Sequence, residues 1–308
     1  MAPSVRRKKE PPMTAKSNRC FPYVLMDVFS SKPLEGNQLA VFTNAHGLSD
    51  VEMQALAREM NLSETTFIFP DAQAKPGDPV RVRIFTVEEE LPFAGHPTLG
   101  TATAVRGTSG LPQVTLDLNV GHIPVTFEDR PDGVFGEMRQ RDPEFGPSFP
   151  HSEVAAAIGL KTDDLDADLP VQSVSTGVAF AIVCVKRLKT LQAFRPDWRR
   201  VSEYLADKAA KFFYVVCRET VNPSARLHAR MIFYNGEDPA TGSAAGCCTA
   251  WMVANGIAQP GERVLIEQGS EMRRPSSIFV RGDKNGDRVA NIRVGGYTVE
   301  VARGEMRL

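Results

Sequence analysis

The stretch EEELPFAGHPTLGTATAV (residues 88–105) decides how this chain folds, because three carboxylates are followed by a run with no charge at all. A second stretch, GEDPATGSAAGCCTAWMVAN (residues 236–255), has the same form. In each stretch a Glu-x-Pro-x-x-Gly pattern precedes the uncharged run; it begins at Glu90 and again at Glu237, an offset of 147 residues in a chain of 308. An offset close to half the chain indicates a duplicated unit.

The uncharged runs predict two enclosed helices. A helix on a sheet surface keeps one polar face, whereas a helix that is apolar or small on every side must be covered all round. Residues 97–105 and 243–254 carry no charge, and their many Gly, Ala and Thr residues allow strands to approach closely. We therefore expect an α+β fold of two pseudo-repeated domains, each a curved, mostly antiparallel sheet wrapped around a central helix. Gly95 and Gly242 open these helices, and two such N-termini facing each other across a cleft would form an anion site.

Strand patterns flank both helices and divide the chain. The Pro-rich segment RDPEFGPSFP (residues 141–150) predicts a boundary between the halves. We expect a flexible basic tail over residues 1–20, an N-terminal domain over residues 21–142 and a C-terminal domain over residues 143–295. Near the end of the chain, RVANIRV and YTVEVA predict two separate strands.

The composition limits the function classes. The chain has 36 basic and 37 acidic residues and a formal charge of −1, so neither a nucleic acid nor a membrane surface is expected as a partner. A hydrophobic content of 42% is typical of a soluble globular protein, and no apolar run reaches the ~18 residues that span a bilayer. The five cysteines form no CxxC spacing, which favours free thiols in the cytoplasm and predicts no metal site.

Five ordered motifs resemble those of the phenazine biosynthesis PhzF-like family, which belongs to the wider diaminopimelate epimerase fold. They are GNQLAVF, NLSETTFIF, ELPFAGHPTLGTA, GEDPATGSAAG and the C-terminal segment that begins QGSEMRRPSSIFV, and they run from about residue 22 to residue 308. The resemblance implies a two-domain homodimeric enzyme with its site in the cleft and with neither a metal nor an organic cofactor. It also implies that residues 296–308 return to the N-terminal domain. The family's best-studied members isomerise a dihydro-hydroxyanthranilate, a ring that carries a carboxylate.

The resemblance assigns three catalytic residues and five substrate-binding residues. The catalytic candidates are Glu64, His96 and Asp238, and the binding candidates are Asn37, Ser63, Gly95, Gly242 and Ser243.

The residues themselves allow this chemistry but also simpler roles. Glu64 begins an apolar strand, where burial would raise its pKa and suit it to exchange protons; a solvated glutamate at a strand end is the alternative. His96 at a helix N-terminus would stay neutral, or it would act only as a structural cap. Asp238 precedes a helix, where the dipole stabilises any carboxylate. The backbone N–H groups at Gly242 and Ser243 would receive a substrate carboxylate.

Glu88 and Glu89, which stand just before the first uncharged run, are expected to lie in an exposed loop.

Cysteine positions separate two kinds of enzyme. Diaminopimelate epimerase and proline racemase use two thiols, each directly before the glycine that opens a central helix. This sequence has Ala94 and Thr241 there, while Cys247 and Cys248 come more than a turn later and are typical of core residues. A two-thiol racemase is therefore disfavoured. The sequence leaves three functions open: a cofactor-independent isomerase with Glu64 as general acid and base, an amino-acid epimerase with non-thiol bases, and a catalytically silent binding protein.

Overall fold

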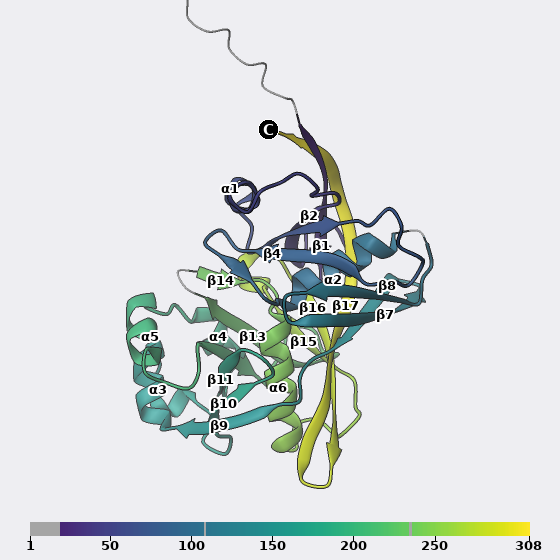
Figure 1. Cartoon of the computed structure of the whole chain (residues 1–308). Coiled ribbons are helices and arrows are strands. Elements are labelled where there is room, and N and C mark those ends of the chain that lie inside the picture. The colour runs from purple at the N-terminus through teal and green to yellow at the C-terminus, as the bar shows by residue number, and fades with distance from the viewer. Residues whose placement is uncertain (1–18, 108, 234–235) are drawn as a thin grey trace, which may run out of the picture.

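The computed structural model describes residues 19–107, 109–233 and 236–308 (Figure 1). The helices are α1 (Asp50–Met60), α2 (Gly95–Arg106), α3 (His151–Ile158), α4 (Leu188–Ala193), α5 (Trp198–Leu205) and α6 (Gly242–Ala254), with short 3-10 turns η1 (Thr162–Asp164) and η2 (Ser270–Met272). The strands are β1 (Cys20–Val28), β2 (Asn37–Phe42), β3 (Thr65–Phe69), β4 (Val80–Phe85), β5 (Glu90–Leu91), β6 (Gln113–Leu118), β7 (Gly121–Arg130), β8 (Gly133–Arg139), β9 (Glu144–Phe149), β10 (Val171–Ser175), β11 (Ala179–Val185), β12 (Phe212–Cys217), β13 (Ala225–Phe233), β14 (Gly236–Asp238), β15 (Val264–Gln268), β16 (Ser276–Asn285) and β17 (Arg288–Arg307). Most of the predicted tail lies outside the described residues, and its last residue, Cys20, already begins β1.

The strands around α2 close into a ring. β1 pairs with β2, β2 runs parallel to β3, β3 pairs with β4, and β4 runs parallel to β6. β6, β7 and β8 follow in antiparallel order, and β17 then joins β8 back to β1. Inside the ring, α2 is buried from Gly95 through Ala102, which is why its sequence needs no polar face.

The strands around α6 form a curved sheet in the order β9, β10, β11, β12, β13, β15, β16 and β17, with parallel pairs between β11 and β12 and between β13 and β15. α6 is buried from Ala244 through Val253, and Trp251 lies fully inside. One apolar cluster includes residues of both α2 and α6, such as Leu99 and Cys248, so the two enclosed helices share a continuous core.

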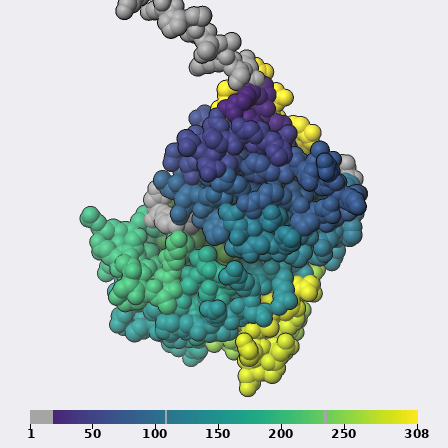
Figure 2. Space-filling model, in the orientation of Figure 1, coloured from purple at the N-terminus to yellow at the C-terminus, as the bar shows by residue number. Residues whose placement is uncertain are grey.

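β17 spans the molecule as a single strand of 20 residues, where the sequence predicted two strands. It pairs in turn with β16, with β8 and, over Thr298–Arg307, with β1. The Gly295–Gly296 pair does not make a turn; it permits close approach, because a Cβ at Gly295 would lie 2.5 Å from the Gly136 oxygen. In Figure 2 the C-terminal residues (yellow) therefore appear at two opposite ends of the molecule. At one end they lie beside the N-terminal strand (purple), and at the other end they lie far from it.

The Pro-rich segment at residues 141–150 is more regular than the sequence predicted. Residues Glu144–Phe149 form β9, which pairs with β10 and has no second strand partner within the described residues. An edge strand accepts a proline because one side of its backbone needs no ladder hydrogen bond, and this accounts for Pro147. Within the same described ranges, no helix is long and apolar enough to cross a membrane.

Close packing around α2 can be tested at Gly100. A Cβ there would lie 2.6 Å from Cδ2 of Leu39 and 2.8 Å from Cγ2 of Val28, both in the core. We expect Gly100→Ala to lower the free energy of unfolding by about 1–3 kcal/mol through overpacking, although alanine favours helices more than glycine does. Urea denaturation measures the effect. An unchanged or higher stability would contradict the tight enclosure of α2.

Candidate active site

The N-termini of α2 and α6 lie against each other. A Cβ built on Gly95 would lie 3.2 Å from the backbone nitrogen of Ser243 and 3.4 Å from Cα of Gly242. The residues that precede the helices, Ala94 and Thr241, provide no side-chain cap for the helical N–H groups. Three of the binding candidates, Gly95, Gly242 and Ser243, are thus brought together at one junction, where two helix dipoles favour negative charge.

Glu64 and His96 face each other at this junction through two atoms that have no hydrogen-bond partner. Glu64 lies between Asn61, which ends α1 in the left-handed conformation, and the first residue of β3. Its Oε2 atom is 3.6 Å from Nε2 of His96, which is too long for a hydrogen bond. Both atoms are buried and have no hydrogen-bond partner. A pair of buried, unsatisfied acid–base groups needs an explanation beyond packing.

Asn37 connects these groups to the other half of the site. Its Nδ2 donates to Oδ1 of Asp238 at 2.8 Å and to the carbonyl oxygen of Ala240 at 2.9 Å. The same nitrogen lies 3.2 Å from Nδ1 of His96. Asn37 begins β2 in the first ring, whereas Asp238 ends β14, so one amide ties together the surroundings of both central helices.

Burial sets the protonation of the three titratable groups. It raises the pKa of Glu64 to about 8, and the nearby charge of Asp238 raises it further. Burial lowers the pKa of His96 to about 3, against an opposing contact with the backbone of Gln38. Burial also raises the pKa of Asp238 to about 6, although hydrogen bonds from Thr241, Asn37 and Ser63 lower it. At neutral pH the site therefore holds a proton on Glu64, a neutral imidazole and a mainly ionised Asp238.

Two residues that the sequence did not single out hold Asp238. Thr241 donates its hydroxyl to Oδ2 of Asp238 at 2.5 Å. Gln268 donates from Nε2 to the Asp238 carbonyl oxygen at 2.7 Å and to the Thr241 hydroxyl at 3.0 Å. Thr241 could have been found by its place directly before the helix-opening glycine. Gln268 stands in the C-terminal motif, but nothing near it in sequence indicates its partner 30 residues away.

The cysteines and the acidic loop take no part in the junction. Cys247 and Cys248 are buried within α6, and burial raises the pKa of the Cys247 thiol to about 11, so it is not a ready base. Glu88 and Glu89 are exposed. Over residues 19–107, 109–233 and 236–308, no group of three or more His, Cys, Asp or Glu side chains is arranged to hold a metal ion.

The fold and the junction define a protein of the phenazine biosynthesis type. A crystal structure of the Bacillus anthracis phenazine biosynthesis protein of the PhzF family superposes with a TM-score of 0.84 at 28% identity, over 94% of this chain and 99% of that one. The model of the phenazine biosynthesis-like protein family matches residues 26–304. The chain belongs to this family, as its motifs indicated.

Two curated relatives cover nearly the full length. An uncharacterized isomerase of Mesorhizobium japonicum is 37% identical over 92% of this chain and 98% of its own. The trans-2,3-dihydro-3-hydroxyanthranilate isomerase of Pseudomonas aeruginosa is 36% identical over 93% of this chain and 99% of its own. With such relatives, this member of the family is an enzyme of the isomerase class.

The raised pKa of Glu64 makes stability depend on pH. Its carboxyl keeps a proton in the folded state that the unfolded chain releases between the ordinary value of 4.5 and about 8. Stability therefore falls as pH rises through this window, by at most about 1.4 kcal/mol per pH unit for this group. We expect Glu64→Gln to gain stability relative to the wild type as pH rises from about 5 to about 9. Urea denaturation across this range measures it; a difference independent of pH would contradict the shift.

Proposed function

We propose that this enzyme is a cofactor-independent isomerase that shifts a proton within a small, cyclic, carboxylate-bearing substrate like dihydro-hydroxyanthranilate. The observation that carries the proposal is the buried, unpartnered pair formed by Oε2 of Glu64 and Nε2 of His96, 3.6 Å apart beside two helix N-termini. The substrate class comes from the name of the Pseudomonas aeruginosa relative.

Glu64 acts as general base and then as general acid. In its ionised form it takes a proton from a carbon next to the conjugated system, and the double bond shifts. The carboxyl then delivers a proton, which can exchange with solvent while it is held on Glu64, to another carbon. One C–H bond breaks and one forms, so no electron acceptor is required. A pKa of about 8 suits both steps, because it lies close to neutral pH, where the carboxyl can both accept and release a proton.

His96 and Asp238 orient the substrate around Glu64. A neutral His96 offers Nε2 for one hydrogen bond, and the ionised Asp238 accepts from a substrate amine or hydroxyl. The free N–H groups of Gly95, Gly242 and Ser243 receive the substrate carboxylate. His96 is only 4% exposed and Asp238 only 9%, so we infer that the substrate enters when the two helix ends separate.

We further infer that the molecule is two pseudo-repeated domains with the site in the cleft between them. The order of strand pairing supports this: β1 to β8 around α2 matches β10 to β17 around α6, with parallel pairs at the same steps. The N-terminal domain would comprise residues 21–142 with 296–308, and the C-terminal domain residues 143–295. The family resemblance supports a homodimer, and the five cysteines without CxxC spacing favour the cytoplasm.

An amino-acid epimerase with non-thiol bases is the second candidate. It is favoured by the two carboxyl groups, Glu64 and Asp238, which come from opposite sides of the junction and lie close enough for the charge of Asp238 to raise the pKa of Glu64. Such an enzyme would invert one carbon and leave the ultraviolet spectrum unchanged. A proton shift within a conjugated ring would change that spectrum.

Exchange of protons with D2O tests the role of Glu64. With dihydro-hydroxyanthranilate and a panel of cyclic amino acids, we expect the wild type to incorporate deuterium and Glu64→Gln to lose at least about 100-fold in rate. Substrate affinity should stay within a few fold, because glutamine keeps the shape of the side chain. Glu89→Gln, the same change at an exposed glutamate that precedes α2, is the matched control and should behave as the wild type. Equal rates in Glu64→Gln would refute the mechanism.

A further inference from the structure

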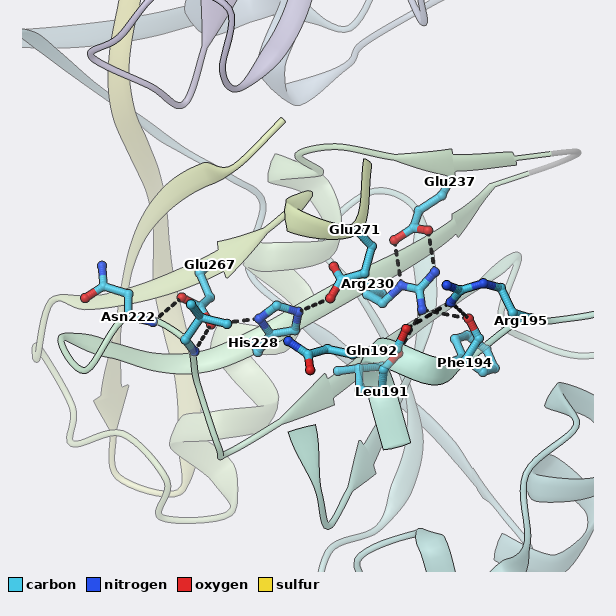
Figure 3. Close-up of polar contacts among 11 residues, drawn as sticks. Leu191, Gln192, Phe194, Arg195, Asn222, His228, Arg230, Glu237, Glu267 and Glu271 are labelled. Atoms are coloured by element: carbon cyan, nitrogen blue, oxygen red, sulfur yellow. Dashed lines mark hydrogen bonds and ion pairs between the residues drawn. The ribbon is translucent and has the colours of Figure 1, made fainter. Parts of the chain in front are cut away.

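The strand β13 carries two buried cations that face the same way, His228 and Arg230 (Figure 3). The His228 ring is fully buried; its Nδ1 lies 2.7 Å from Oε1 of Glu267, and its Nε2 lies 3.0 Å from Oε1 of Glu271. Glu267 also accepts the backbone N–H groups of Val221 and Asn222. The imidazole therefore lies between two carboxylates, Glu267 from β15 and Glu271 from η2, and contacts both.

His228 is an imidazolium at neutral pH. Burial lowers its pKa, but hydrogen bonds to Glu267 and Glu271 outweigh this and bring the pKa to about 9. The other groups that face it are Arg230 on its own strand and the thiol of Cys217, directly opposite on β12. The cluster of one imidazolium and two carboxylates has a charge of −1. Loss of the imidazolium charge would leave two buried carboxylates facing each other, which is strongly unfavourable.

The carboxylates of this cluster flank the residue that holds Asp238. Glu267 directly precedes Gln268, whose amide donates to the Asp238 carbonyl oxygen at 2.7 Å. Between Gln268 and Glu271, Gly269 has φ +83°, and a Cβ there would lie 2.4 Å from the carbonyl oxygen of Pro239. His228 thus contacts both ends of the segment 267–271, at Glu267 and Glu271. The middle of the segment, Gly269, packs against Pro239, the residue that follows Asp238.

Arg230 fixes the residue before Asp238. It donates from Nε and Nη2 to the two oxygens of Glu237, at 2.8 and 2.6 Å. Its Nη1 also donates to the carbonyl oxygens of Leu191 and Phe194. The same two-bond contact joins Arg83 to Glu90, 147 residues earlier, also at 2.8 and 2.6 Å. The residue that follows Glu90 is Leu91, whereas the residue that follows Glu237 is Asp238. The Arg83–Glu90 contact therefore has no carboxylate beside it that corresponds to Asp238.

We propose that His228 and Arg230 are positioning residues that hold the Asp238 carboxylate in the geometry the reaction needs. The proposal rests on the proposed function of Asp238. It explains why two cations are buried on β13, although neither reaches the helix junction. The cation pair acts on both neighbours of Asp238 along the chain: Arg230 through Glu237, and His228 through Gln268 and the turn at Gly269.

The positioning role of His228 can be tested by removing its charge and then restoring the net charge of the cluster with a second substitution. His228→Gln changes the cluster charge from −1 to −2, and His228→Gln with Glu271→Gln returns it to −1. We expect the single variant to lose at least about 10-fold in kcat with KM nearly unchanged, and the double variant to recover most of the loss. His151→Gln is the matched control and should keep wild-type kcat, because among the described residues His151 forms hydrogen bonds to the carbonyl oxygens of Asp166 and Leu169 and to no carboxylate. A folded single variant with full kcat, or a double variant no better than the single, would overturn the proposal.

Two further measurements keep the proposal testable if His228→Gln does not fold. In the wild type, kcat should fall as pH rises through about 9, where His228 loses its proton, and the double variant should lack this fall. Arg230→Lys should lower kcat at least several-fold more than Arg83→Lys, since lysine cannot make the two-bond contact in either place. Equal effects of the two lysine variants would count against the proposal.

A readout without turnover separates this proposal from the proposed function. The pKa of the Asp238 carboxyl, followed by carbon-13 NMR, should move in His228→Gln and return in the double variant. If the wild type shows no proton exchange with any substrate, the proposed function fails, and the Asp238 titration still decides whether His228 positions that carboxylate. An unchanged titration in His228→Gln would overturn the positioning role.

Discussion

The contact between the N-termini of two enclosed helices is the constraint on which the rest of the structure depends. Because α2 and α6 have no polar face, strands must surround both of them. Their first turns can therefore meet only at helix ends that the strands leave uncovered. Gly95 allows that meeting, because a side chain there would press on Gly242 and Ser243, and Gly242 leaves room for the ring of Phe29. The unpaired N–H groups of both helices then gather at one point, and the acid–base residues lie around it.

Burial lowers the pKa of both buried histidines, but their partners lead to opposite charge states. His96 has no carboxylate within hydrogen-bonding distance, and burial lowers its pKa to about 3, so it stays neutral. His228 lies between two carboxylates, and their hydrogen bonds raise its pKa to about 9 despite burial. The molecule thus keeps a fixed charge near the residues that hold Asp238, and an uncharged ring beside Glu64, which we propose exchanges a proton with the substrate. The partners of each ring, more than its depth, decide which role it can take.

Much of the fold and of the candidate site could be predicted from short patterns. The repeated Glu-x-Pro-x-x-Gly motif predicted both helix starts, because a glycine at the first helical position and an uncharged run are local signals. His96 directly follows one copy of this motif and Asp238 stands in the other, which places them beside the two helix starts, whereas Glu64 was indicated only by the resemblance of NLSETTFIF to the family. The single strand β17 was missed because a Gly-Gly pair within it is typical of a turn, and only contact with Gly136 and Phe29 shows its real use. The links from His228 to Glu267 and Glu271 were missed because they join residues 39 and 43 positions apart.

A direct titration of Glu64 tests the central claim, that burial at the helix junction keeps a proton on this carboxyl near neutral pH. Infrared difference spectra between the wild type and Glu64→Gln isolate its carboxylic acid band, and the band can be followed as pH is raised. We expect the band to be present at pH 6 and to disappear with a midpoint of about 8. A midpoint near the ordinary value of 4.5 would show that the carboxyl is ionised under working conditions and would contradict the account.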